Sequence, residues 1–448
     1  MSSSSQNQAT SLQELIDRAG GSPVRALYAP TIPTWKPPVV PDEYTGWRQE
    51  QEAAHTTVSL SDLSHHMWDI WLEGEDTIPL LSSLSTNSYA SFEIGQAKQF
   101  VAVTERGRII SDDIVMRYDE NRYVLSGVPF ALHWVQYHAE HGDWKVRVHP
   151  DPPTNLRGSD PLIFRYQIQG PRALDLFERA FGTPAPEVKF FHSGRVSLDG
   201  REFFALRHGM LGQPGFELIG DWELAERVHG LLLEAGEDVG LARVGSLSYS
   251  TNAAASGWLP QPTPAIYSDP ELRPYREWLE ADTFEGHYPL HGSFFSENIE
   301  DYYISPYELD YGRMIKFDHD FVGREALERD REAEHRRKVT VVFDAQDVAR
   351  VLGDPGFYCS FGQYRIEAGG ELVGIGYYTT NVPSAGGLLS LALVKQSHAE
   401  PGTEVEFVWG VHPNPDADPE FHRELPRIKA VVAPSPYDEY ARTTYRQN

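Results

Sequence analysis

Three short stretches place acid or amide side chains where packing alone does not require them. "SDD" (111–113) puts Asp112 and Asp113 at the entrance of an apolar run, and "RYQIQGP" puts Gln167 and Gln169 on one face of an expected strand. "GQPGFELIG" sets Glu217 between apolar residues, where a lone carboxylate is costly unless it is paired or binds a donor-rich ligand. Groups of these types can hold a ligand by hydrogen bonds or move a proton.

A fourth stretch, "GSLSYSTNAAASGW" (245–258), has no charge and only two large side chains, Tyr249 and Trp258. Its small residues predict a turn or loop, and a phenol held there can act as a proton donor. Each of the four stretches also has a purely structural explanation. An acid can cap a turn, a strand glutamine can pair with backbone, and a buried glutamate can meet an arginine such as Arg207.

Other kinds of catalytic site are not indicated. The sequence has no Walker A or G-x-G-x-x-G fingerprint, and Cys359 is far from any His–Asn pattern. His65 and His66 are adjacent on an expected strand, so they point to opposite faces and at most one of them faces a given site. No Cys/His set completes a zinc shell, and we therefore expect no metal.

The elements that would carry these residues divide the chain into four parts. Residues 1–44 read as a Pro-rich extended segment, and residues 45–150 as an α+β domain that forms part of the core around the ligand. Residues 151–329 follow a strand–helix–hairpin–helix order, which predicts a ferredoxin-like α+β domain carrying Gln167, Glu217 and Tyr249. Residues 330–448 begin with a charged linker and continue as short strands between Gly and Pro turns, which predicts a small β-barrel.

Composition bounds the location and partners of the protein. The 448 residues carry 65 acidic and 39 basic side chains, a net charge of −26 that repels phosphate backbones, so we expect no nucleic-acid partner. The single cysteine excludes an intrachain disulfide, and no apolar run approaches the roughly 20 residues that span a bilayer. A cytoplasmic protein without membrane contact is expected, and the sequence leaves its oligomeric state open.

The order of the four stretches along the chain is more specific than any one of them. Together with "SPYELDYGRMIKFDHDFVGREAL" and "GELVGIGYYTTNVPSAGGLLSLALV", it resembles the aminomethyltransferase (glycine-cleavage T-protein) family over residues 45–435. Within that family, "SHHM", "SGWLPQPTPAIY", "NIEDYYISPYE" and "KFDHDFVGR" are most similar to the tetrahydrofolate-dependent aryl-ether O-demethylases that act on vanillate, 3-O-methylgallate or syringate. The resemblance implies an α+β fold of three domains around a central hole that holds tetrahydrofolate.

The resemblance also implies roles for individual residues. Glu217 would accept hydrogen bonds from the pterin ring, Gln167 would meet the same ring, and Trp258 would pack on it or on the aminobenzoate. Asp112 would be the acid near the reactive nitrogen, with Asp113 as the alternative because the alignment can slip by one residue. The remaining positions are Tyr267 for the cofactor and His65, His66, Tyr28, Val128 and Phe130 for the substrate.

Tyr249 matches the tyrosine that serves the aryl-ether demethylases. Moving a one-carbon unit from an aryl ether to folate expels a phenolate, and a phenol O–H beside that oxygen can assist its departure by ~10²–10⁴-fold. The folate is itself the acceptor, so no nucleophilic side chain is required. The group delivered is methyl from a methoxyarene or methylene from a methylenedioxyphenyl ring, and the sequence does not separate the two.

Two departures from the family pattern bear on the substrate. "TNAAASG" replaces the Arg-Leu-Glu-Ala-Gly-like run of the T-proteins, which argues against glycine cleavage. "LSGVPFALHW" lacks the arginine that benzoate-type demethylases carry before this helix, which favours a neutral lignan-like or methoxyarene substrate. The alternatives are a vanillate- or syringate-type demethylase whose carboxylate anchor is His133 or Arg25, and a folate-binding regulatory protein without turnover.

Overall fold

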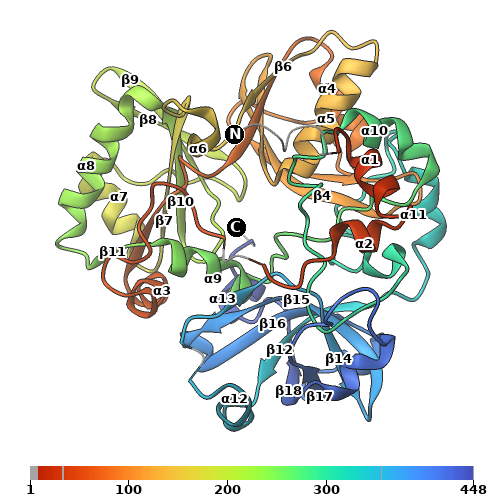
Figure 1. Ribbon diagram of the computed structural model, residues 1–448. Coiled ribbons are helices and arrows are strands. Elements are labelled where there is room, and N and C mark those ends of the chain that lie inside the picture. The colour runs from red at the N-terminus through yellow and green to blue at the C-terminus, as the bar shows by residue number, and fades with distance from the viewer. Residues whose placement is uncertain (1–8, 33–34, 355, 447–448) are drawn as a thin grey trace, which may run out of the picture.

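The protein folds into three lobes arranged around a common centre (Figure 1). In the computed structural model, residues 9–32, 35–354 and 356–446 are described. One lobe is built on a six-stranded sheet, the second on a five-stranded sheet, and the third is a β-barrel. The expected α+β fold with three such parts is confirmed.

The five-stranded sheet is antiparallel throughout and carries the "SDD" stretch on its second strand. Its order is β3 (Ala97–Val103), β4 (Ile109–Asp119), β5 (Arg122–Gly127), β2 (Trp68–Glu73) and β6 (Arg147–Asp151). Helices α4 (Thr77–Leu84) and α5 (Pro129–His141) pack against it, and Gly142 ends α5 as the sequence predicts. This lobe therefore holds Asp112 and Asp113 on a rigid, buried strand.

The six-stranded sheet carries the glutamine and glutamate positions. Its order is β11 (Leu241–Arg243), β1 (Val58–Asp62), β7 (Ile163–Gln169), β10 (Gly215–Asp221), β9 (Arg201–Leu206) and β8 (Ser193–Leu198). Helices α7 (Ala173–Phe181) and α8 (Ala225–Gly236) cover this sheet, and the short α6 (Thr154–Arg157) precedes β7 in the chain. Strand β1 lies before the domain boundary expected at residue 150 and pairs with β7, which lies after it. The burial of a strand's apolar face, rather than its order in the chain, determines which strand it pairs with. The expected boundaries themselves stay predictions.

The third lobe confirms the expected barrel. Six strands close on themselves in the order β14 (Tyr364–Ala368), β17 (Glu404–Val408), β18 (Arg427–Ala433), β12 (Arg337–Phe343), β16 (Gly387–Val394) and β15 (Glu371–Val382). The short β13 (Cys359–Ser360) pairs with β15, and α12 (Ala345–Leu352) packs on the outside. Full closure leaves these six strands without an open edge.

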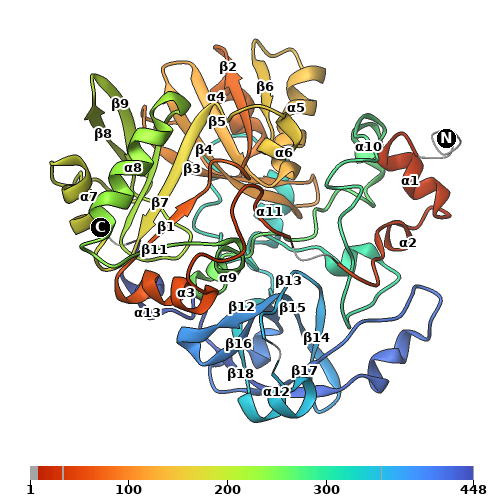
Figure 2. The ribbon, with the colours of Figure 1, turned by 60° about the vertical axis from the view of Figure 1, so that its left-hand side comes forward.

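The remaining elements connect the lobes (Figure 2). They are α1 (Leu12–Arg18), α2 (Pro23–Leu27), α3 (Trp47–Thr56), α9 (Ser246–Ser256), α10 (Arg273–Trp278), α11 (Arg324–Asp330) and α13 (Glu439–Thr443). Single 3-10 turns cover Trp222–Leu224, Pro270–Leu272, Ile299–Tyr302, Pro383–Ala385, Gln396–His398 and Pro419–Glu424. The N-terminal part is thus not extended throughout, because Ser11 and Ser22 cap two short helices through their side-chain oxygens.

The stretch around Tyr249 forms a helix, so the expectation of a loop was wrong. Three consecutive alanines favour helix strongly, and hydroxyls inside the helix bond back to its own carbonyls, as Ser250 does to Ser246 at 2.9 Å. Gly257, with a φ of 74°, ends the helix in the left-handed conformation. Helix α9 packs between α3 and strand β15, so Tyr249 stands on a fixed support where the lobes meet.

Candidate active site

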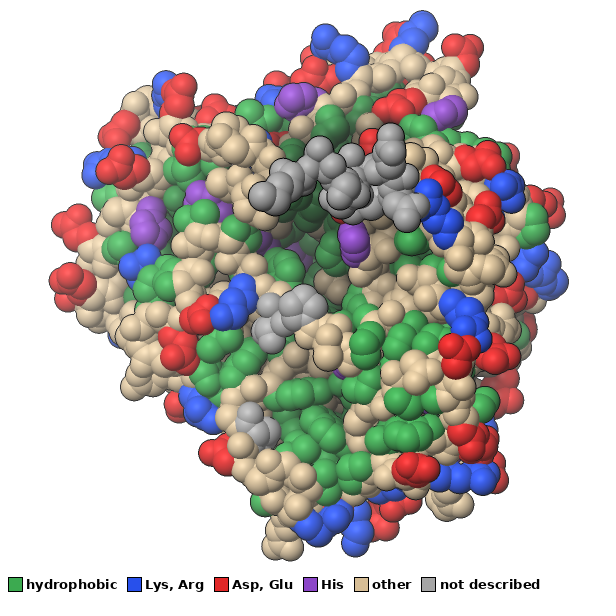
Figure 3. All heavy atoms as spheres, in the orientation of Figure 1, with side chains coloured by type: hydrophobic (Ala, Val, Ile, Leu, Met, Phe, Trp, Pro, Cys, Tyr) green, Lys and Arg blue, Asp and Glu red, His purple; other side chains and the backbone are tan. Residues whose placement is uncertain are grey.

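A cavity lies where the two sheet lobes meet the C-terminal residues of the chain. Figure 3 shows one face of the molecule hollowed at its centre, with hydrophobic and histidine side chains along the walls. The cavity wall is mostly apolar, but it includes Asp112, Asp113, Arg165, His208 and Glu217. Several charged groups converging on an apolar, concave wall are typical of a ligand site.

Glu217 and Gln167 face each other across two paired strands. They are direct partners in the antiparallel register of β10 and β7, which puts both side chains on the same face of the sheet. Glu217 is 5% exposed and its Oε1 lies 3.0 Å from Nη1 of Arg165. Oε1 of Gln167 accepts from the N–H of Met210 at 3.3 Å, while its buried Nε2 has no partner among the described residues. The pair thus presents a free amide donor beside a carboxylate.

Arg165 was not singled out in the sequence, although it shares the face of β7 with Gln167. Its guanidinium bridges Glu217 on one side and Asp69, at 3.1 Å, on the other, and donates to Ser126 at 2.6 Å. The bridge joins the six-stranded sheet to the five-stranded sheet. The two-residue alternation from Arg165 to Gln169 was the signal that could have revealed it.

Asp112 is the centre of a hydrogen-bond network on β4. One oxygen accepts from Gln99 Nε2 at 2.7 Å and from the hydroxyl of Tyr311, and the other lies 3.4 Å from Nε1 of Trp258. Burial raises the pKa of Asp112 to about 6, and these hydrogen bonds oppose part of that change. Gln99 and Tyr311 had no distinguishing pattern in the sequence.

Asp113 points to a different set of partners. It accepts from the Ser111 hydroxyl at 2.8 Å and from the N–H of Val128 at 2.8 Å, just before helix α5. Burial raises its pKa well above the ordinary value. A Cβ on Gly127 would lie 1.7 Å from Oδ1 of Asp113, so only glycine allows this contact.

Tyr249 is paired with His66 beside the cavity. Its hydroxyl oxygen lies 2.8 Å from Nε2 of His66 and 3.6 Å from Sδ of Met210, which lines the cavity. Burial raises the pKa of Tyr249 above its usual value and lowers the pKa of His66 to about 3, so the phenol is protonated and the imidazole neutral at pH 7. The ring of Trp35 packs edge-on to His66 at 5.6 Å.

The two adjacent histidines lie in the turn between β1 and β2, so their expected position on a strand was wrong. Their side chains nevertheless take different directions, because His65 contacts the hydroxyl of Thr154 at 3.0 Å and the ring of Trp222. Only His66 reaches Tyr249. No group of three or more metal-ligating side chains is found among the residues that the structure describes.

Several sequence-predicted residues lie away from the cavity wall. The hydroxyl of Tyr267 donates to the backbone oxygen of Glu285 at 3.0 Å, and Phe130 is fully buried, so both serve packing. The hydroxyl of Tyr28 donates to the carbonyl of His412. Val128 approaches the site only through its N–H bond to Asp113.

The two alternative carboxylate anchors are also engaged elsewhere. Nδ1 of His133 lies 2.7 Å from a Glu285 oxygen, and Arg25 pairs with Asp416 at the surface at 2.7 Å. Neither residue lines the cavity.

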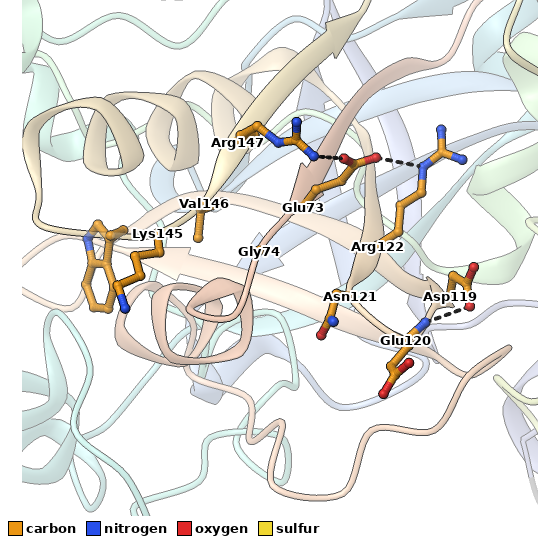
Figure 4. Close-up of a pocket in the computed structure, with 10 residues that line it drawn as sticks. Glu73, Gly74, Asp119, Glu120, Asn121, Arg122, Lys145, Val146 and Arg147 are labelled. Carbon is orange, nitrogen blue, oxygen red and sulfur yellow. Dashed lines mark hydrogen bonds and ion pairs between the residues drawn. The ribbon is translucent and has the colours of Figure 1, made fainter.

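A second hollow opens at the outer edge of the five-stranded sheet (Figure 4). Its charged groups neutralise one another, since Glu73 pairs with Arg122 at 3.3 Å and with Arg147 at 2.9 Å. These ion pairs are open to solvent, whereas the wall of the central cavity holds buried acids, one of which, Glu217, is the cross-strand neighbour of the unpartnered Gln167 amide. The central cavity is therefore the candidate site.

Comparison with known proteins identifies the family. The GCVT N-terminal domain matches residues 28–257. Syringate O-demethylase from a Sphingobium species is 37% identical over 98% of both chains, and sesamin methylene transferase from a Sinomonas species is 27% identical over 83% of this chain and 86% of its own. No helix among the described residues is long and apolar enough to cross a membrane.

A solved structure agrees with the fold. The glycine cleavage system aminomethyltransferase T from Bartonella henselae superposes with a TM-score of 0.62, at 18% identity, covering 96% of this chain and 97% of its own. This match supports the three-lobed fold, and the family model together with the 37% identical relative confirms the resemblance inferred from the order of sequence stretches. The chain belongs to the GCVT, or aminomethyltransferase, family.

Proposed function

We propose that this protein transfers a one-carbon group from an aromatic ether to tetrahydrofolate and releases a phenol. The observation that carries the proposal is the protonated Tyr249, bonded to neutral His66, beside a cavity that contains two buried carboxyl groups of raised pKa. The names of the two relatives, one an O-demethylase and one a methylene transferase, support the same reaction class. Because the chain has a single cysteine, we place the reaction in the reducing cytoplasm.

The wall of the cavity fits a reduced pterin. Such a ring presents adjacent N–H groups and a carbonyl, which match the carboxylate of Glu217 and the unpartnered Nε2 of Gln167. Arg165 holds the Glu217 carboxylate in place, and Trp258 supplies an aromatic face next to Asp112. Bound tetrahydrofolate would supply the nucleophilic nitrogen that accepts the one-carbon group.

Tyr249 is proposed to protonate the oxygen that leaves. As the ether bond breaks, negative charge develops on that oxygen, and a phenol O–H donated to it stabilises the departing phenolate. His66 fixes the direction of the Tyr249 hydroxyl through its 2.8 Å contact. The neutral state of His66 avoids placing a permanent cation beside the ether.

Asp112 is proposed to handle the second proton. A carboxyl group with a pKa of about 6 exchanges protons readily near neutral pH, so it can take up the proton lost at the acceptor nitrogen. Its bond from the Tyr311 hydroxyl and its contact with Trp258 fix its position in the cavity wall. Asp113, which accepts from Ser111 and from the Val128 N–H, stays the alternative acid.

The substrate is proposed to be a neutral methoxyarene or a methylenedioxyphenyl compound. The wall near Val128 has no cation among the described residues, Arg165 is neutralised by Asp69 and Glu217, and Arg446, the other arginine of the cavity, lies exposed at the rim against Phe190. A benzoate placed there would lose its hydration without gaining an ion pair. The delivered group is then methyl or methylene according to the ether used.

The test is a small substrate panel with tetrahydrofolate. Vanillate, syringate, guaiacol and a methylenedioxyphenyl lignan are each incubated with the protein, and mass spectrometry identifies the folate product. A 5-methyl or 5,10-methylene product from a neutral member supports the proposal. Turnover of the benzoates alone would replace it with a syringate-type demethylase, and no product from any member would remove the enzymatic proposal.

A further inference from the structure

The cavity contains a cation that no carboxylate of the described residues neutralises. Arg165 and Arg446 are the arginines in its wall, and Arg165 forms ion pairs with Asp69 and Glu217. Arg446 makes no ion pair within the described part of the chain. Its guanidinium carbon lies 5.8 Å from the centre of the Phe190 ring, and the side chain is exposed. An unpaired arginine at the rim of a ligand cavity is available to bind an anion.

The position of Arg446 is fixed by the residues before it. The hydroxyl of buried Tyr445 donates to the carbonyl of Gly209 at 2.9 Å, and its ring packs against Phe190 at 5.3 Å. Asp438 caps helix α13, and its carboxylate accepts from the N–H of Ala441 at 2.8 Å. The backbone N–H of Asp438 donates to the carbonyl of Ala255 in α9. These contacts dock the last described residues on the loop that carries His208 and Met210, next to the end of α9 (Figure 1).

The charge of Arg446 acts on the Asp112 side of the cavity. Burial lowers the pKa of His208, and Arg446 is among the charges that lower it further. Burial and the Asp112 carboxylate raise the pKa of Tyr311, and Arg446 opposes this change. Burial and Glu217 set the raised pKa of Tyr249, to which Arg446 does not contribute. The charge of Arg446 is therefore felt by His208 in the cavity wall and by Tyr311, the hydrogen-bond partner of Asp112.

We propose that Arg446, held in place by Tyr445, binds a carboxylate of the glutamyl tail of tetrahydrofolate. The inference rests on the proposed use of folate. A protein with a net charge of −26 repels an anionic tail unless a local cation receives it, and a guanidinium can hold a carboxylate through two parallel hydrogen bonds. The exposure of Arg446 at the rim suits a tail that leaves the cavity while the ring stays inside.

Binding calorimetry without any aromatic ether tests the inference. The ligands are tetrahydrofolate and tetrahydropteroate, which lacks the glutamate, and the proteins are the unmodified chain, Arg446→Gln and Arg442→Gln. Arg442 is a matched control, because it is exposed in the same segment, bonds the carbonyl of Pro436 at 2.7 Å and does not line the cavity. We expect Arg446→Gln to lower the affinity for tetrahydrofolate about tenfold or more, because a charged pair of hydrogen bonds is lost. The affinity for tetrahydropteroate should be unchanged.

The possible results separate this inference from the proposed function. The unmodified chain could bind both ligands, and Arg446→Gln could lower the two affinities equally or not at all. That result overturns the role of Arg446 and leaves folate use intact. An unchanged tetrahydrofolate affinity with a raised KM for syringate assigns Arg446 to a substrate carboxylate and also overturns it. Binding of neither ligand by the unmodified chain overturns folate use and this inference together.

Discussion

The hydroxyl of Tyr249 has two neighbours of different character, a neutral imidazole and a thioether. A phenol in such surroundings stays protonated far above pH 7, because burial disfavours the phenolate and no cation stabilises it. It is suited to donate a proton to an oxygen that becomes charged during reaction. At the scale of single residues, the proposed chemistry therefore depends on keeping Tyr249 protonated and His66 neutral.

Replacing Tyr249 with Phe removes this donor and keeps the ring. We expect the rate of product formation to fall by ~10²–10⁴-fold while tetrahydrofolate affinity is retained. Tyr275→Phe is the matched control, because the buried Tyr275 hydroxyl has no hydrogen-bond partner among the described residues. Single-turnover kinetics and calorimetry measure the two quantities, and an unchanged rate in Tyr249→Phe would remove Tyr249 from the mechanism.

Asp112 makes folding stability depend on pH. Burial raises its pKa from 3.8 to about 6 in the fold, so the folded protein binds the extra proton and the stabilising contribution is fully present at low pH. This contribution, about 3 kcal/mol in free energy of unfolding, is lost as the pH rises from the unfolded pKa through the folded one. Asp112→Asn cannot ionise, so we expect its melting temperature relative to the unmodified protein to increase between pH 4 and pH 7. A difference independent of pH would contradict the assignment.

At the scale of elements, helix α9 ends at the point where the C-terminal residues are docked. A Cβ on Gly257 would meet Pro436 at 2.9 Å and would sit on a backbone with a φ of 74°. We expect Gly257→Ala to lower the free energy of unfolding by about 1–2 kcal/mol, because it combines left-handed strain with a backbone contact. Gly230→Ala in α8, with open space around its Cβ and no positive φ, is the control and should be neutral or slightly stabilising.

Thermal unfolding and limited proteolysis distinguish the two glycine variants. Because Gly257 contacts the segment that leads to α13, faster cleavage near residues 436–446 should accompany the loss of stability in Gly257→Ala. Equal behaviour of the two variants would show that the close approach of Pro436 to α9 does not hold the C-terminal residues.

Individual helices and strands were easier to predict from the sequence than the contacts between them. The Asp199–Gly200 hairpin, helix α5 with its Gly142 stop and the closing barrel follow from local turn and capping signals. Helix α9 was missed because small residues promote turns as well as helices, and only packing against α3 and β15 decides between them. The match of Gln167 to Glu217 required β10, which the sequence had not revealed as a strand.

At the scale of the whole molecule, the site depends on contacts that no local pattern encodes. Asp112 meets Tyr311 across 199 positions of sequence, and Tyr445 reaches Gly209 across 236. Family resemblance named Asp112, Glu217 and Tyr249, which the structure places in the cavity wall or beside it. It also named Tyr267 and Phe130, which the structure buries in the packing of the core. The place of Arg446 in the cavity wall depends on the assembled lobes, and no pattern in the sequence indicated it.

The parallel pairing of β1 with β11 sets an order for assembly during synthesis. Val58 pairs with Leu241, and the same strand pairs on its other edge with β7, whose residues come about a hundred positions later than its own. The six-stranded sheet therefore cannot close until residue 243 has emerged from the ribosome, and the turn bearing His66 has no fixed place before then. Such distant pairings slow folding relative to local ones. His66 can therefore meet Tyr249 only after all five strands of the five-stranded sheet have been synthesised.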